Sequence, residues 1–477
     1  MSTVIDAAPP PVAAGQAPGK GRWIEDWRPE DADFWASTGK KVAKRNLIFS
    51  IFSEHLAFSV WVIWSILVVS LGTLKDASGV ALYPDLVATP ANADKIFWLV
   101  ALPNLIGALM RFPYTLAVGR FGGRNWTVIS ALLLLIPVGL ALYVVLTPGV
   151  SYGFLLFAAI TAGFGGGNFA SSMSNISYFY PERSKGTALG INAAGGNIGL
   201  SSMQLFMPLM LFMGLSLTFA TAFWLPLVLA SAVCAFFFMN NLHVSKATLA
   251  QQFAAAKRKH AWIMSFLYIG TFGSFLGLAA SFPATLKFVF PDDQKFNFLG
   301  TGLLLPIAFL GPLVGSLARP FGGWIADRVG GALVTAGVFA LMAVCSFGAI
   351  AAASARNLGM FIASMLVLFA MAGAGNGSTY RMIPAIFKRQ ADAEIARTPG
   401  QEEKLIAQSR REGAATLGMA GAIGAIGGFI LPKVIGDSIK ATNGIGNAFS
   451  WFIAMYVVCL IVTLVVYVRK GATMSRV

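Results

Sequence analysis

Long apolar segments alternate with short polar connections along almost the whole chain. Each apolar segment is long enough, as a helix, to cross about 30 Å of hydrocarbon. The apolar runs are continuous rather than alternating with polar positions, which is typical of helices and not of half-buried strands. We therefore predict twelve transmembrane helices, at residues 46–72, 95–119, 125–147, 152–180, 187–213, 217–240, 261–290, 298–325, 332–354, 358–386, 412–437 and 445–468.

An internal repeat divides these helices into two groups. The spacing of two arginines and a following Gly-Gly pair begins at Arg111 and again at Arg319, an offset of 208 residues. Duplicated halves around a central site are typical of secondary transporters. We expect an all-α polytopic membrane protein with two pseudo-symmetric six-helix halves. The predicted boundaries are a tail at 1–45, halves at 46–240 and 261–468, a linker at 241–260 and a second tail at 469–477.

Composition and charge narrow the class of protein. The chain is 56% hydrophobic and 12% charged, about half the charged fraction of a soluble domain. Its net charge of +15 could indicate nucleic-acid binding, but 25 of the 35 Lys and Arg fall in the tails and inner loops if both termini are cytoplasmic. That asymmetry is the positive-inside rule. We therefore predict cytoplasmic termini, contact with the lipid bilayer and no nucleic-acid partner.

Residues suited to catalysis or metal binding are scarce. The three cysteines lie far apart within predicted spans, and none of the three histidines lies near a cysteine or a pair of acidic residues. A membrane enzyme needs a metal cluster or a nucleophile beside a base. We predict that the chain is not an enzyme and has no catalytic residues, no metal site and no cofactor.

Two arginines inside the predicted spans are the candidate binding residues. Arg111 and Arg319 lie roughly 10 Å inside the ends of their helices. They could extend to the membrane interface. However, a charge in the membrane costs at least about 2.5 kcal/mol, and their symmetric positions favour a site between the halves. A guanidinium fork suits oxyanions, and repulsion between two facing arginines would disfavour an empty closed state, which suggests exchange of one anion for another.

The roles of three other ionisable residues within the predicted spans are interpreted separately. Glu54 and His55 are the candidate proton carriers. In one interpretation, Glu54 pairs with the surroundings of His55 or with a basic residue near the start of the helix. In the other, Glu54 and His55 couple transport to protons. Arg381, which follows Tyr380 late in its span, is interpreted as structural or interfacial.

The segment GFGGGNFASSMSN at residues 163–175 is rich in small residues. It lacks the Gly-Lys-Ser/Thr ending of a phosphate loop and lies within a span, so helix packing is the simpler interpretation. We expect a smooth helix face in each half, turned toward a common axis, with Phe169 at its edge as a wall of the anion site. The residues of this face repeat at the same offset and are Gly165, Gly167 and Asn168 with Gly373, Gly375 and Asn376.

Several motifs together resemble a known family. The segments ALPNLIGALMRFPY, GFGGGNFASSMSNIS, GTALGINAAGGNIG, LVGSLARPFGGWIADRVGG and GAIGAIGGFILPK are similar to the nitrate/nitrite porters of the major facilitator superfamily, and to the bacterial antiporter type in particular. The resemblance extends from about Trp23 to the C-terminus. It implies a nitrate site on Arg111 and Arg319, and it assigns further substrate contacts to Phe169, Asn197, Tyr268 and Phe272.

The resemblance implies nitrate/nitrite exchange in the inner membrane of a bacterium. We also expect alternating access and a monomer. The antiporter type carries apolar residues where this chain has Glu54 and His55. The alternative within the class is therefore a nitrate–proton symporter that uses Glu54 or His55. A channel or a non-transporting sensor is the alternative outside it, although duplicated halves favour alternating access.

Overall fold

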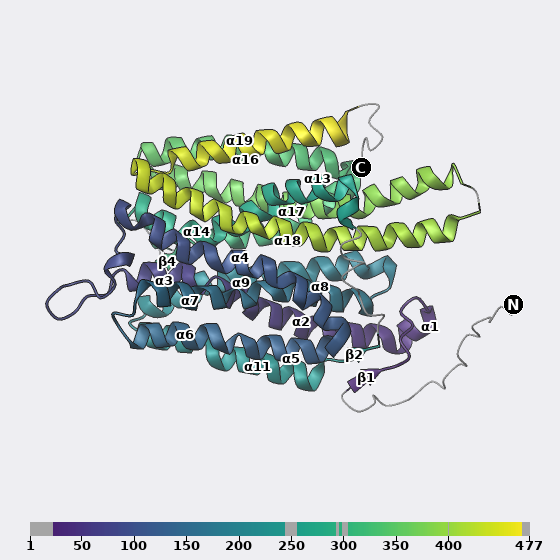
Figure 1. Cartoon of the computed structure of the whole chain (residues 1–477), viewed down its shortest axis with the longest axis horizontal. Helices are drawn as coiled ribbons and strands as arrows, with labels where there is room; N and C mark the ends of the chain where they lie inside the picture. Colours follow the sequence, from purple (N-terminus) through teal and green to yellow (C-terminus); the bar gives the residue numbers. More distant parts are fainter. Residues whose placement is uncertain (1–21, 244–254, 292–294, 298–303, 399, 470–477) are drawn as a thin grey trace.

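The computed structural model describes residues 22–243, 255–291, 295–297, 304–398 and 400–469. These residues form a bundle of long helices that run roughly along one axis (Figure 1). Within the described residues, ten helical stretches are long and apolar enough to cross a membrane. Two further long helices, α9 (Glu182–Phe212) and α15 (Leu310–Val329), pack in the same bundle. The arrangement is compatible with twelve spans and defines a multi-pass membrane protein.

The bundle has two halves, the N half and the C half. The helices of the N half are α2 (Lys40–Trp61), α3 (Ile63–Leu71), α4 (Ala93–Phe121), α5 (Gly123–Leu133), α6 (Leu135–Leu146), α7 (Tyr152–Ala162), α8 (Phe164–Phe179), α9, α10 (Leu217–Ala222) and α11 (Trp224–Phe238). Those of the C half are α13 (Lys259–Tyr268), η6 (Ile269–Gly273), α14 (Ser274–Val289), α15, α16 (Gly331–Ser354), α17 (Leu358–Ile395), α18 (Glu402–Thr442), α19 (Gly446–Thr463) and η8 (Leu464–Val468).

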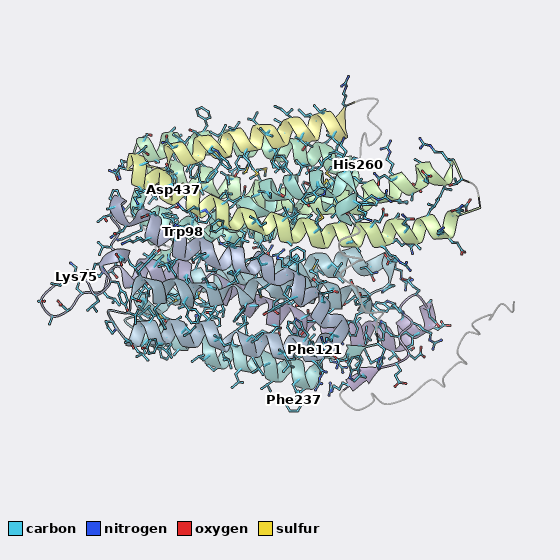
Figure 2. All side chains as sticks on the ribbon, in the orientation of Figure 1. Lys75, Trp98, Phe121, Phe237, His260 and Asp437 are labelled. Carbon is cyan, nitrogen blue, oxygen red and sulfur yellow. The ribbon has the colours of Figure 1, made fainter. Side chains whose placement is uncertain are left out.

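The two ends of the bundle differ. At one end, called the near end, lie the strands β1 (Trp23–Ile24) and β2 (Asn241–Leu242) and the projecting parts of α17 and α18 (Figure 1). His260 lies toward this end, whereas Lys75 lies on a loop at the opposite, far end (Figure 2). The far-end loop also contains the short helical turns η3 (Pro84–Leu86) and η4 (Pro90–Asn92).

Four helices of the N half are interrupted by a single residue, at Val62, Leu134, Gly163 and Phe223. Proline accounts for two of these breaks, because its ring nitrogen cannot donate to the carbonyl four residues earlier. Pro137 leaves Leu133 without that bond and Pro226 does the same to Ala222, and these are the last residues of α5 and α10.

Several predicted boundaries differ from the structure. The helix expected at 298–325 begins only at Leu310, because Leu304–Pro306 (β4) pairs antiparallel with Lys295–Asn297 (β3). Residues 298–303 of that prediction lie outside the described residues. The helices α17 and α18 continue well past the predicted spans and project from the near end (Figure 1). Their projecting turns are polar. A helix satisfies its own backbone N–H and C=O groups in water as well as in lipid, so it can continue beyond the membrane.

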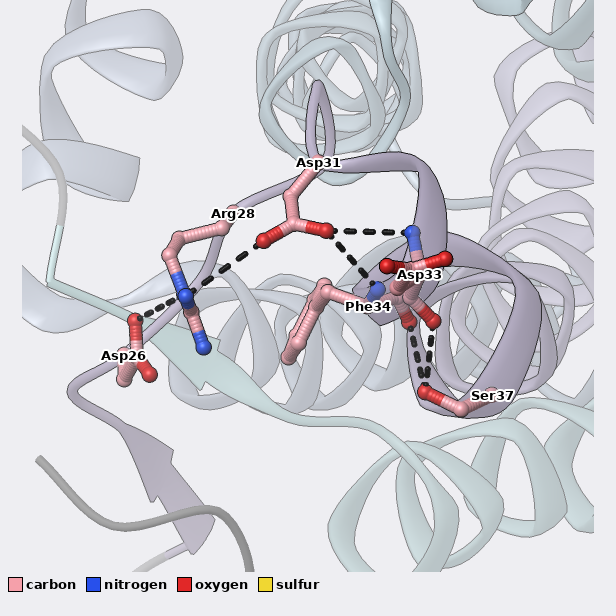
Figure 3. A network of polar contacts seen from close by, with 6 residues as sticks. All are labelled: Asp26, Arg28, Asp31, Asp33, Phe34 and Ser37. Carbon is pink, nitrogen blue, oxygen red and sulfur yellow. Dashed lines mark hydrogen bonds and ion pairs between the residues drawn. The ribbon is translucent and has the colours of Figure 1, made fainter.

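Part of the predicted N-terminal tail is folded against the near end of the N half. β1 pairs in parallel with β2, and Trp27 Nε1 donates to the Tyr178 carbonyl oxygen at 3.1 Å. Figure 3 shows the turn that follows, where Arg28 bridges Asp26 and Asp31 at 3.1 and 3.4 Å. Asp31 in turn accepts from the first backbone amides of α1 (Ala32–Phe34), which the π-helical turn η2 (Trp35–Gly39) joins to α2. The segment from residue 22 onward is thus a structural part of the N half. Residues 1–21, 244–254 and 470–477, in the predicted tails and linker, lie outside the described residues.

Glycine allows two pairs of helices to approach closely. A Cβ atom at Gly165 of α8 would lie 2.2 Å from the Ala57 carbonyl oxygen of α2. A Cβ atom at the repeat-related Gly373 of α17 would lie 1.9 Å from the Gly315 carbonyl oxygen of α15. Both contacts lie within a single half. At these two positions glycine therefore allows helices of the same half to pack closely. Whether the glycine and polar face as a whole turns toward a common axis stays a prediction.

Candidate anion site

Arg111 of α4 in the N half and Arg319 of α15 in the C half come together against one aromatic ring. They are 2% and 5% exposed. Their guanidinium carbons lie 4.7 and 5.6 Å from the centre of the same aromatic ring, that of Phe169 on α8. The two charges are therefore at most about 10 Å apart, on a shared aromatic wall. The structure thus places the two predicted arginines and Phe169 in one cluster.

Arg111 has one nitrogen engaged and two free. Nη1 donates to the Gly421 carbonyl oxygen of α18 at 2.7 Å, which connects the N half to the C half. Nε and Nη2 are buried and have no hydrogen-bond partner among the described residues. These two nitrogens lie on one edge of the planar guanidinium, so they form a fork that two oxygen atoms of an anion can accept from. Nη1 of Arg319 is likewise buried without a partner in the described part of the chain.

An aromatic layer surrounds the arginines. The Phe272 ring lies 4.9 Å from the Arg111 guanidinium carbon and stacks on Phe169, with ring centres 6.1 Å apart. Tyr268 stacks on Phe272 at 5.3 Å. Phe272 belongs to the π-helical turn η6, a local widening of the helix that occurs often at functional sites. Cation–π attraction stabilises a buried guanidinium by about 2 kcal/mol. These aromatic faces therefore offset part of the free-energy cost of burying both charges.

Two aromatic residues that the sequence did not indicate complete this layer. Tyr380 of α17 lies with its ring centre 5.6 Å from the Arg319 guanidinium carbon and 6.1 Å from the Tyr268 ring. Trp61 of α2 lies 5.9 Å from the guanidinium carbon of Arg111. The sequence position of Tyr380 could have marked it as a site residue, because it follows the repeated glycine face by only a few residues. Nothing in the sequence marks Trp61, since a tryptophan in an apolar helix usually packs in the hydrophobic core.

The other predicted polar contact, Asn197 of α9, is buried, and neither of its side-chain polar atoms has a hydrogen-bond partner among the described residues. No contact between Asn197 and either arginine is found in the described part of the chain. Asn376, from the repeated polar face, has the same unpartnered side chain. Of the remaining residues of that face, a Cβ atom at Gly167 would lie 2.9 Å from the Tyr114 ring and one at Gly375 would lie 2.7 Å from Thr271 Cγ2, so each glycine faces a neighbour of its own half.

Glu54 is buried close to the site, on α2. Its Oε2 accepts a 2.7 Å hydrogen bond from Asn192 Nδ2, which also lies 2.6 Å from Ser172 Oγ. The charges of Arg319 and Arg111 act electrostatically on this carboxyl. Glu54 has no ion-pair partner within hydrogen-bond distance among the described residues, so the pairing with a basic residue near the start of the helix is absent there. The neighbouring His55 is directed elsewhere, with Nδ1 3.1 Å from the Gly195 carbonyl oxygen.

The site therefore carries excess positive charge. Of the described residues, the buried charged ones are Arg111, Arg124, Arg319 and Glu54, and Arg124 is held elsewhere by the Phe236 carbonyl oxygen. At a separation of at most about 10 Å and an effective dielectric of about 20, Arg111 and Arg319 repel each other by at least roughly 1.7 kcal/mol. A small anion between them would relieve that repulsion and accept from the free nitrogens. Arg381, by contrast, forms an exposed ion pair with Asp327, in agreement with a structural role.

Comparison with known proteins agrees with this architecture. The sequence profile of the Major Facilitator Superfamily matches residues 47–398. The chain is 38% identical to the "Nitrate/nitrite transporter NarU" of Salmonella typhimurium (strain LT2), over 94% of this chain and 96% of the relative. It is 34% identical to the "Probable nitrate/nitrite antiporter NarK2" of Thermus thermophilus, over 95% of this chain and 98% of the relative. Among solved structures, a D-xylose–proton symporter covers 88% of this chain and 97% of its own, with 15% identity and a TM-score of 0.59.

The fold and its relatives define a membrane transporter of two helical halves, and not an enzyme. The chain belongs to the Major Facilitator Superfamily and, within it, to the family of the nitrate/nitrite transporters. The resemblance inferred from the motifs is confirmed. The solved structure at 15% identity supports the fold alone.

Proposed function

We propose that this protein exchanges nitrate and nitrite across the cytoplasmic membrane by alternating access, at a site built on Arg111 and Arg319. One observation carries the proposal. Two buried guanidinium groups, one from each half, lie against the same Phe169 ring and have three nitrogens without a partner among the described residues. Such a site requires an anion, and the curated relatives carry nitrate and nitrite in their names.

The shape of the surroundings favours a flat anion. Phe169 and Phe272 stack with an angle of 29° between their planes and both face Arg111. A planar nitrate or nitrite fits against nearly parallel rings and presents two oxygens to the guanidinium fork in one plane. Tetrahedral phosphate or sulfate is thicker and carries more charge to desolvate. We therefore expect these anions to bind poorly.

Exchange follows from the charge of the site. With no anion, the two arginines repel each other in a water-poor environment, and reorientation of the empty transporter is disfavoured. With nitrate or nitrite bound, much of that repulsion is relieved. The transporter then crosses between its two states mainly when loaded, which couples inward movement of one anion to outward movement of another.

Counterflow in proteoliposomes tests this mode of transport. Vesicles loaded with nitrite and diluted into nitrate should exchange the anions one for one, with no change in internal pH. Empty vesicles should take up little nitrate. Uptake into empty vesicles that depends on an imposed proton gradient would contradict exchange and favour the second candidate.

That second candidate is nitrate–proton symport through Glu54. The observation that favours it is the burial of Glu54, 1% exposed, as the one buried acidic side chain of the described residues, within electrostatic range of both arginines. His55 is less suited, since its Nδ1 faces the Gly195 carbonyl oxygen. The Glu54→Gln variant separates the two modes, because exchange survives this change and symport does not.

Three further features belong to the same proposal. We place the near end of the bundle in the cytoplasm, so that both termini and the linker at 241–260 lie inside the cell, in the inner membrane of a bacterium. The two halves at 46–240 and 261–468 then move as the two bodies of alternating access. The site is built entirely within one chain, so a monomer suffices for transport.

A further inference from the structure

The two halves are joined by a restricted set of polar contacts. Among the described residues, four direct hydrogen bonds or ion pairs connect the N half to the C half: Arg111 with Gly421, Asn104 with Gly428, Gln204 with Ala279, and Asp94 with Lys440. All of them lie at the depth of Arg111 or nearer the far end. The far end is therefore the closed side of the bundle in this conformation.

Two of these contacts have the same unusual chemistry. Asn104 Nδ2 of α4 donates to the Gly428 carbonyl oxygen of α18 at 2.9 Å, and Gln204 Nε2 of α9 donates to the Ala279 carbonyl oxygen of α14 at 2.6 Å. Within a regular helix, each of those oxygens would accept from the backbone amide four residues later. In both cases that later residue is a proline, Pro432 after Gly428 and Pro283 after Ala279.

Proline has no backbone N–H, so it leaves the carbonyl of the residue four positions earlier without its helical donor. In a membrane protein such a carbonyl must find another partner or remain costly. For Ala279 and Gly428 of the C half, the partner is an amide side chain of the N half. All four groups are buried, and the two proline kinks are close neighbours, because Gly277 of α14 packs on Leu431 and Pro432 of α18.

Each amide also lies on the far-end side of a predicted site residue. Asn104 precedes Arg111 by seven residues on α4, and Gln204 follows Asn197 by seven residues on α9. Because the two helices run in opposite directions, both amides are about two turns, or roughly 10 Å, farther toward the far end than these residues. A pocket of about 170 Å³ adjoins Gln204 on this side, lined also by Ser70, Pro208 and Pro283.

We infer that Asn104 and Gln204 form a polar latch between the two halves, which closes the far side of the anion site by capping the carbonyls that Pro432 and Pro283 leave free. The latch rests on the alternating access proposed above. It positions the halves without touching the substrate. When the far side opens, both amides separate from their carbonyls, and water entering from that side replaces them. A kinked helix thus has a donor from the other half in one state and from water in the other.

Distance measurements between spin labels test the latch directly. Labels are placed at Pro148, in the far-end turn after α6, and at Ala355, in the far-end turn after α16. Both residues are exposed, and they belong to different halves. The native Cys234, Cys345 and Cys459 are replaced by alanine, and distances are measured by double electron–electron resonance in lipid. The variants are Asn104→Leu and Gln204→Met, which keep the side-chain shape and remove the amide.

A hydrogen bond contributes about 0.5–1.5 kcal/mol net, so each variant should raise the ratio of long to short far-end distances by roughly twofold to tenfold. The matched control is Tyr456→Phe, which removes a buried bond of 2.9 Å to Ser274 Oγ inside the C half and should leave the ratio unchanged. Each variant is first checked for folding by size-exclusion chromatography. If only one of the two amide variants folds, its distance ratio alone tests the latch. An unchanged ratio in a folded amide variant, or an equal shift in the control, would overturn the latch.

The same preparations keep this inference separate from the proposed function. Nitrate/nitrite counterflow is measured on the cysteine-free parent. Failure of counterflow with shifted distances would remove the substrate assignment and leave the latch. Normal counterflow with unshifted distances would remove the latch and leave the substrate assignment.

Discussion

Replacing Arg111 by lysine keeps the positive charge and removes the guanidinium fork, so it separates the contributions of the two. The structure assigns Nη1 of Arg111 to the Gly421 carbonyl oxygen and leaves Nε and Nη2 on one edge of the group. A lysine ammonium at this position can contribute one donor to the anion where the fork contributes two. The change therefore removes at least one charge-assisted hydrogen bond, and the two aromatic faces remain.

The expected loss can be estimated from that single bond. A hydrogen bond to a charged group contributes about 1.5–3 kcal/mol, which corresponds to roughly a 10- to 150-fold weaker affinity for nitrate. For Arg319, Nη1 is the one nitrogen that is both fully buried and without a partner among the described residues. Arg319→Lys replaces the second planar guanidinium of the site by an ammonium, and it should also weaken nitrate binding, by about 1.5–3 kcal/mol for one charge-assisted hydrogen bond.

Nitrate titration of the purified variants, together with counterflow rates over a range of nitrate concentrations, measures both effects. The matched control is Arg381→Lys, because Arg381 forms an exposed ion pair with Asp327 and lies outside the cluster. Its nitrate affinity should equal that of the unmodified protein. An affinity of Arg111→Lys within twofold of that protein would refute the fork, as would an equal loss in the control.

Three further changes test other parts of the account. Glu54→Gln should leave nitrate/nitrite counterflow intact at pH 6 and pH 8; abolished transport would instead favour the symporter. Gly373→Ala should lower the stability by about 2 kcal/mol or more, seen as a drop in melting temperature, because its Cβ would meet the Gly315 carbonyl oxygen at 1.9 Å. Gly337→Ala, with open space around it, is its control. Trp27→Ala should destabilise the folded N-terminal segment by roughly 1–2 kcal/mol, because Trp27 is only half-buried, and should expose the segment to protease; unchanged cleavage would argue against its docking.

Much of the fold could be predicted from the sequence, since the length and apolar character of a segment indicate a membrane-spanning helix. The boundaries that failed had specific causes. The helix expected from residue 298 starts at Leu310, because apolar strand residues and apolar helix residues look alike over short runs. The near-end extensions of α17 and α18 are polar, so hydropathy could not reveal them.

The candidate site was predictable where symmetry or charge marked it. Arg111 and Arg319 are conspicuous because a charge in a membrane span is rare and these two recur at one offset. Trp61 and Tyr380 could not be recognised, since their importance depends on which helices pack together. The glycine face was recognised as a packing feature, but the helices against which it packs were not. A one-dimensional pattern shows that helices approach closely, but it does not identify the partner helix, which here is α2 for Gly165 and α15 for Gly373.

The most direct test of the central claim is a structure of the protein determined in saturating nitrate. One flat anion is expected between Arg111 and Arg319, in contact with the Phe169 ring and within hydrogen-bond distance of Nε and Nη2 of Arg111. Anion density elsewhere in the bundle, or none between the two arginines at saturating nitrate, would contradict it.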